Sequence, residues 1–235
     1  MRGVLLVLTA SACGRLGFDA HAHAPADALD ASVDAIADAG EPPCGTTAIF
    51  DDGFDDGVPE PLFTAHQAVG VTITESDSTV QFALGAVPAA HYAAYRSVAM
   101  YGPEGACAVA DIAALPDPAV MAAASYFKLL SSTEQLEVFE YGDRIECRTH
   151  QDGDTNIQVV GHTTWDPQTT RFWRIHQIGG VTYWAVSGDG VAFVTICSAA
   201  FAITDPVQVE VGAGAIADIT GGGTASFASV TVTGP

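Results

Sequence analysis

The chain has 235 residues, eight Lys and Arg against 28 Asp and Glu, and a formal net charge of −20 at pH 7. A nucleic-acid partner is not expected, because binding phosphates requires a basic face. An acidic membrane surface would also repel the chain, whereas divalent cations would be attracted to it. The length allows one domain of ordinary size and a tail.

The first thirteen residues have the order of a secretory signal. One positive charge precedes an apolar run from Val4 to Leu8, and the small residues 9–12 lead to Cys13. The run is too short to span a bilayer. A cysteine in this place resembles the lipobox of bacterial lipoproteins, which implies a signal peptide over residues 1–12 and a lipid anchor on the Cys13 thiol. Gly14 in the next position implies an outer-membrane or cell-surface location; an ordinary secretory signal is the alternative.

The segment from Asp19 to Pro43 is rich in Ala and Asp and contains no aromatic residue, Lys or Arg. It buries too little apolar surface to offset its ordering entropy. We therefore expect residues 13–43 to form a disordered linker. A weak amphipathic helix around residues 27–38 is the alternative, although it would be marginal in water.

From Cys44 to Pro235 the sequence consists of short alternating runs separated by Gly, Asp and Pro, which is typical of β-strands. Tight turns are expected at Gly142-Asp143, Gly179-Gly180 and 188–190. Pro116 and Pro118 interrupt the Ala-rich segment, so no long helix is expected. Residues 44–235 are therefore predicted to be an all-β sandwich or barrel, with strands at 47–50, 69–74, 79–84, 92–98, 106–112, 120–129, 135–141, 144–150, 157–164, 171–178, 181–187, 192–197, 207–213 and 224–232.

Four cysteines remain if Cys13 carries a lipid. An even number in an exported chain predicts two disulfides, with scattered buried thiols as the alternative. Their long spacings make a zinc site improbable. The sequence leaves all three pairings open for Cys44, Cys107, Cys147 and Cys197.

An acidic cluster lies at the start of the domain. Carboxylates crowded on a turn repel one another unless a cation is present, and Ca²⁺ prefers flexible oxygen ligands of this kind. The cluster therefore predicts a calcium site, with a solvated acidic turn as the alternative. The ligands would be Asp51, Asp52, Asp55 and Asp56.

Aromatic residues gather in the expected hairpin of residues 171–193. Strand alternation places Trp173 on one face and Arg174 and His176 on the other, while Tyr183 and Trp184 alternate on the partner strand. One set should fill the core between the sheets, and the other would form a platform on which a sugar ring stacks. The candidate carbohydrate-binding residues are Trp173, Arg174, His176, Tyr183 and Trp184.

This hairpin resembles one found in concanavalin-A-like lectin/glucanase (LamG-like) domains. Residues 50–54 (FDDGF) are similar to the opening of those domains, and residues 207–214 and 225–232 are similar to their closing strands. The resemblance implies an antiparallel two-sheet jelly roll with its first and last strands adjacent. It also implies carbohydrate as the ligand class, because many members bind it and some hydrolyse it.

Glucanases of that superfamily carry a Glu-x-Asp-x-x-Glu strand whose outer carboxylates perform the reaction. The nearest segment here places acids three residues apart, so Glu137 should face away from Glu134 and Glu140. No catalytic residue is assigned on this basis. The sequence favours an envelope-anchored, polysaccharide-binding lipoprotein; a divergent glycoside hydrolase and a structural lipoprotein without a small ligand are the alternatives.

Overall fold

The computed structural model describes residues 43–55, 62–152 and 156–235, which belong to one compact unit, Gly40–Pro235. The predicted signal peptide, Cys13, nearly all of the linker, and Asp56 lie outside the described residues. The described segments form strands and turns, and among them no helix is long and apolar enough to cross a membrane.

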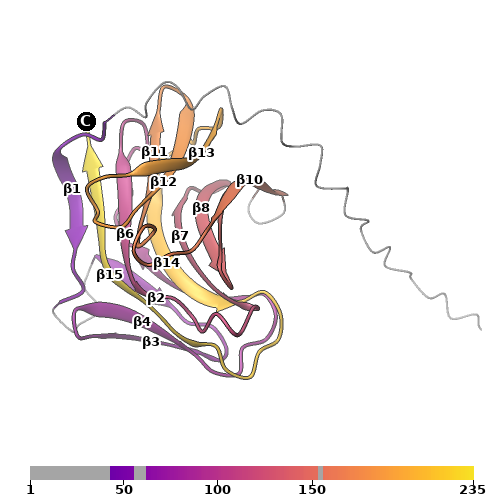
Figure 1. Ribbon diagram of the computed structural model, residues 1–235. Coiled ribbons are helices and arrows are strands. Elements are labelled where there is room, and N and C mark those ends of the chain that lie inside the picture. Colours follow the sequence, from indigo (N-terminus) through magenta and orange to yellow (C-terminus); the bar gives the residue numbers. More distant parts are fainter. Residues whose placement is uncertain (1–42, 56–61, 153–155) are drawn as a thin grey trace, which may run out of the picture. The chain divides into compact units, whose positions relative to one another are not determined.

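Two antiparallel sheets form the domain (Figure 1). The eight-stranded sheet has the order β13-β12-β11-β6-β15-β4-β3, with β1 also paired to β15. Its strands are β1 (Thr47–Asp52), β3 (Val71–Ser76), β4 (Thr79–Leu84), β6 (Cys107–Ala114), β11 (Phe172–Ile178), β12 (Val181–Ser187), β13 (Val194–Ala199) and β15 (Gly223–Gly234).

The seven-stranded sheet has the order β10-β9-β8-β7-β14-β5-β2. Its strands are β2 (Phe63–His66), β5 (His91–Ser97), β7 (Ala123–Leu130), β8 (Glu134–Tyr141), β9 (Arg144–Gln151), β10 (Asn156–Thr164) and β14 (Gln208–Ala215). The predicted all-β, two-sheet sandwich is thus confirmed.

The first and last strands are neighbours, as the family resemblance implies. Thr47 of β1 lies opposite Gly234 of β15, and the two strands run side by side at one edge in Figure 1. Every predicted strand has a counterpart. The sequence does not predict β2, because four residues show too little alternation to stand out from a loop.

Local turn chemistry explains the hairpins. Gly179 and Gly180, between β11 and β12, have φ of 59° and 78°. This left-handed pair is what a two-residue turn of type I′ requires, and it matches the twist of the flanking strands. Gly142, with φ of 64°, is the first residue of the two-residue turn between β8 and β9.

The core lies between the two sheets and is filled by inward-facing apolar residues from both. Trp173 and Trp184 are among its largest fully buried side chains. The Trp173 indole packs edge-on against Phe227 and donates from Nε1 to the carbonyl of Thr170 at 3.0 Å. This bond satisfies the one polar atom of the indole inside the core.

Both predicted disulfides are present. Cys44 pairs with Cys107 of β6, and Cys147 of β9 pairs with Cys197 of β13. The second bridge therefore joins the two sheets. The sequence predicts the four cysteines as two pairs, and the structure selects one of the three pairings.

Candidate functional site: the outer face of the seven-stranded sheet

The hairpin does not provide the platform predicted from its sequence. Trp173, Trp184 and His176 are all fully buried, so none of their rings can stack on a sugar. Tyr183 is half-buried on the outer side, and Arg174 lies over the ring of Phe193, 4.1 Å from its centroid. The prediction is corrected on this point because the face of the hairpin that carries both tryptophans packs in the core between the sheets, while His176, on the opposite face, lies against the Cys44–Cys107 disulfide.

The calcium site at the acidic turn remains a prediction. Asp51 accepts a hydrogen bond from the Thr231 hydroxyl at 2.9 Å, and Asp52 accepts one from the backbone N–H of Phe54 at 2.8 Å. Asp55 is exposed. Among the described residues, the one group of three potential ligands that converges is Cys44, Cys107 and His176, and its cysteines form a disulfide.

The acids of β8 divide between the two faces as predicted. Glu137 lies on the face that points away from the eight-stranded sheet, whereas Glu140 is buried on the inner side, where it accepts a hydrogen bond from the Ser125 hydroxyl at 3.0 Å. Burial raises the pKa of Glu140 to about 8, against the smaller opposing effect of the Ser125 bond. Glu140 is therefore mostly protonated at neutral pH.

A row of residues at directly paired positions runs across the strands on the outer face of the seven-stranded sheet, and we call it the charged row. Each member lies opposite the next on neighbouring strands, so basic and acidic side chains alternate across four strand pairs. In strand order, from β2 to β9, the row consists of Thr64, Arg96, Glu210, Lys128, Glu137 and Arg148.

Ion pairs bind the row together. Glu210 is engaged by Nε of Arg96 and lies 3.3 Å from Nζ of Lys128. Glu137 lies 3.0 Å from Nε2 of His150, 3.7 Å from Arg148 and 4.0 Å from Lys128. Both carboxylates are almost completely buried, so this arrangement compensates charges that would otherwise be costly to remove from water.

A third carboxylate extends the network. Glu146 accepts hydrogen bonds from Arg148 at 2.7 and 2.9 Å, lies 2.9 Å from Nε of Arg144 and accepts a bond from the Tyr141 hydroxyl at 3.1 Å. Arg148 thus bridges Glu137 and Glu146. The two-fold contact to Glu146 fixes the guanidinium plane more firmly than a single bond would.

Aromatic rings lie beside the charged row in a small cluster separate from the main core. Tyr126 and Phe139 are buried in it, whereas Tyr92 and Tyr141 are half-buried. Ring centroids of successive members are about 6 Å apart: 6.0 Å for Tyr92–Tyr126, 6.1 Å for Tyr92–Phe139 and 5.9 Å for Phe139–Tyr141. Arg148 covers the ring of Phe139, 3.6 Å from its centroid. The rings left accessible are therefore those of Tyr92 and Tyr141.

Two glycines of β14 make room for this cluster. A Cβ added to Gly212 would come within 2.3 Å of the Tyr126 ring, and one added to Gly214 would come within 2.6 Å of the Tyr92 ring. Both rings therefore lie close against the strand where it has no side chains. From this position the Tyr126 hydroxyl donates to Glu210 at 3.0 Å.

Two tyrosines of this face are bonded to carboxylates and remain protonated. The pKa of Tyr126 is raised well above its usual value, first by burial and then by the charge and hydrogen bond of Glu210. The pKa of Tyr141 is raised by burial and by the charge of Glu146. Each phenol is thus held as a hydrogen-bond donor.

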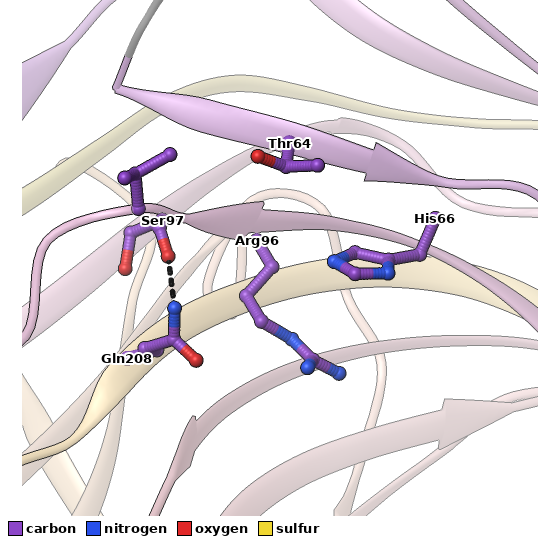
Figure 2. A pocket seen from close by; sticks show the side chains of 6 residues that line it. Thr64, His66, Arg96, Ser97 and Gln208 are labelled. Atoms are coloured by element: carbon purple, nitrogen blue, oxygen red, sulfur yellow. Dashed lines mark hydrogen bonds between the residues drawn. The ribbon is translucent and has the colours of Figure 1, made fainter.

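A pocket of about 290 Å³ opens at the β2 end of the row. Figure 2 shows the side chains of His66, Arg96 and Gln208 around it, with the Gln208 amide bonded to the carbonyl of Ser97 at 2.5 Å. Thr64 and Val98 complete the lining. The pocket therefore continues the charged row to the edge of the sheet.

The geometry of the face suits binding better than hydrolysis. A retaining glycosidase places two carboxylates about 5 Å apart, one of them held protonated as a general acid. Here Glu137, Glu146 and Glu210 lie on three different strands, and each has basic groups within ion-pair distance. These carboxylates are therefore members of one ion-pair network and not a separated acid and nucleophile.

Sequence reasoning missed most of this face, although a signal for it exists. Six Lys and Arg residues follow residue 43. Four of them lie in three of the predicted strands, at alternating positions with aromatic or acidic residues: Arg96, Lys128, Arg144 and Arg148. Because alternate residues share a strand face, this pattern marks a polar side of the sheet.

Comparison with solved structures places the fold among glucanase-like jelly rolls. The pseudo β-1,3-glucanase Rv0315 of Mycobacterium tuberculosis is 13% identical with a TM-score of 0.59, over 81% of this chain and all of that one. The Bacillus licheniformis β-glucanase is 11% identical with a TM-score of 0.57, over 81% and 99%. The fold is thus the concanavalin-A-like β-sandwich.

A module of a phage protein has a similar fold. The CBM2 module of an evolved Dit protein from Lactobacillus casei BL23 phage J-1 is 9% identical with a TM-score of 0.55, over 80% of this chain and 95% of that one. No protein-family model and no curated protein matches the chain. These likenesses establish the fold, and the function has to be argued from the site.

Proposed function

We propose that this protein binds polysaccharide through the outer face of its seven-stranded sheet. The observation that carries the proposal is the pairing of two accessible tyrosines, Tyr92 and Tyr141, with a row of immobilised charged groups on one sheet face. Tyrosine offers an apolar ring for the flat side of a sugar, and the charged groups offer directional bonds to its hydroxyls.

Rigidity supports this proposal. The ion pairs and the cation–ring contact of Arg148 hold the polar groups in place before a ligand arrives. Preorganised groups lose little conformational entropy on binding, so weak contacts along an extended chain add up effectively. Glucanase-like neighbours agree with carbohydrate as the class of ligand.

A glycan array probed with the full-length chain tests the proposal. We expect binding to a subset of polysaccharides and a roughly fivefold loss of affinity in Tyr92→Ala and in Tyr141→Ala, since one lost stacking contact costs on the order of 1 kcal/mol. Tyr183→Ala, a half-buried tyrosine on the other sheet, is the matched control. Binding that depends on Tyr183 and not on the other two would overturn the proposed location.

The proposal includes anchoring to the cell envelope through lipid on Cys13, with an outer-membrane or surface location. It rests on the lipobox-like sequence that ends at this cysteine. Labelling cells with a radioactive fatty acid tests it: the wild-type chain should be labelled and move with membranes, and Cys13→Ser should not. An unlabelled wild-type chain refutes the anchor.

Calcium is proposed as a cofactor at the acidic turn that contains Asp51, Asp52, Asp55 and Asp56. A bound ion stabilises the folded state by mass action. Thermal melting in millimolar CaCl₂ should therefore lie above melting in EDTA, and Asp51→Asn should reduce the difference. Equal melting temperatures argue against the site.

A further inference from the structure

The pocket at the β2 end of the charged row differs in charge from the rest of the protein. The chain carries 28 acidic residues, yet none of the six residues that line this pocket is acidic. The lining instead contains Arg96 and His66, together with neutral groups of Thr64, Ser97, Val98 and Gln208. A cavity with basic and neutral walls on so acidic a protein favours an anion over a neutral or cationic group.

Arg96 has a special position in the charged row. Lys128 lies between two carboxylates of the charged row, and Arg148 lies between one of them and Glu146. Arg96 instead stands at the end of the row, with Glu210 on one side and the uncharged Thr64 on the other. Its side chain is 31% exposed, while that of Glu210 is 2% exposed. The row therefore ends in a basic group at the pocket, with its carboxylate partner buried behind it.

The chemistry of the pocket matches an oxyanion. Glu210 engages Arg96 through Nε, which uses one of the five N–H donors of a guanidinium. Guanidinium groups bind carboxylate and sulfate oxygens through paired N–H donors. The Thr64 hydroxyl and the His66 imidazole also line the pocket (Figure 2) and add further donors.

We infer that this pocket binds an anionic substituent of a polysaccharide, a uronic-acid carboxylate or a sulfate ester, while the sugar backbone extends along the tyrosines. The inference rests on the proposed function and specifies its ligand: an acidic polysaccharide. Strand pairing connects the parts, because β5 carries both Tyr92 and Arg96 on its outer face, four residues apart.

Three matched ligands separate the effect of charge from that of the sugar backbone. The probes are a soluble 1,3-β-glucan, the same glucan oxidised at C6 to the polyglucuronate, and its sulfated form. For the full-length chain at low salt we expect at least about tenfold tighter binding of an anionic form than of the neutral glucan. The advantage should shrink as salt is raised, because exposed charges are screened.

Three variants locate the effect. Arg96→Gln removes the basic group, and His66→Ala removes a donor from an exposed position that leaves the ion-pair network intact. Both should abolish most of the anionic preference. Arg174→Gln makes the same charge change on the other sheet and should not alter it.

The outcomes are distinct. Equal binding of all three probes, or an anionic preference that survives both pocket variants, overturns the anion pocket and leaves the proposed function standing. Absence of binding to the two anionic forms overturns the pocket as well, and the array then decides the proposed function separately. A preference for one anionic form that depends on Arg96 and His66 supports the inference and identifies which oxyanion the pocket accepts.

Discussion

Replacing Glu140 by Gln should stabilise the protein at neutral and alkaline pH. The Glu140 carboxyl is 1% exposed and its pKa is raised from 4.5 to about 8, because burial disfavours the charged form. The folded state therefore holds a proton that the unfolded state releases between these two values. Folding stability is highest below pH 4.5 for this group and falls as pH rises toward 8.

The expected size follows from those two values. At about 1.4 kcal/mol for each tenfold change in proton affinity, the raised pKa costs folding about 3 kcal/mol at pH 7, where the buried carboxyl must take up a proton, and about 5 kcal/mol well above pH 8, where it is buried in its ionised form. A glutamine has nearly the same shape, cannot ionise and still accepts the Ser125 hydrogen bond. The variant should gain most of this free energy at high pH and almost none at pH 4.5.

Urea unfolding followed by tryptophan fluorescence at pH 4.5, 7 and 8.5, without reductant, measures the difference. Glu134→Gln is the control, since Glu134 lies half-buried at the start of the same strand. A free-energy gain for Glu140→Gln that is the same at all three pH values, or a loss at pH 8.5, would refute the reasoning that burial holds this carboxyl protonated.

Three further predictions follow from the packing. Replacing Cys147 and Cys197 together by Ser opens a loop of 50 residues and should lower the free energy of unfolding by about 4 kcal/mol; an unchanged urea midpoint would contradict this. Gly212→Ala should displace Tyr126 from β14, so the near-ultraviolet circular dichroism should change and glycan affinity should fall; an unaltered spectrum with full affinity would contradict the packing. Trp184→Phe should lower the free energy of unfolding by about 1–3 kcal/mol while leaving glycan binding intact. A loss of glycan binding in a variant that is still folded would show that the hairpin takes part in binding.

The sequence predicts the local features of the fold well. Alternation and glycine turns locate the strands, and the Gly179-Gly180 turn between β11 and β12 is formed as expected. The even cysteine count predicts two bridges. The strands and turns depend on residues that are close in sequence, and the number of bridges depends only on the number of cysteines. Neither requires information about the tertiary structure.

The candidate site is harder to predict because its residues come together only through sheet order. Arg96 and Glu210 are 114 residues apart and meet because β14 lies between β5 and β7. The pattern in each strand shows that one face is polar, but it does not give the neighbour of that strand. The predicted aromatic platform on the hairpin fails for a related reason. Both faces of the hairpin carry aromatic residues, and the position of the second sheet determines that Trp173 and Trp184 are covered.

The bridge between Cys44 and Cys107 has a mechanical consequence. Cys44 precedes β1, a strand paired with β15 alone, whereas Cys107 lies in β6 between β11 and β15. Tension applied at the N-terminal side of Cys44 passes through the covalent bridge into β6 and bypasses β1, which would otherwise unzip from the sheet one bond pair at a time. In a single-molecule pulling experiment, the protein with its disulfides intact should unfold in one event at high force. After the disulfides are reduced, an additional event at low force should appear first, as β1 separates from β15.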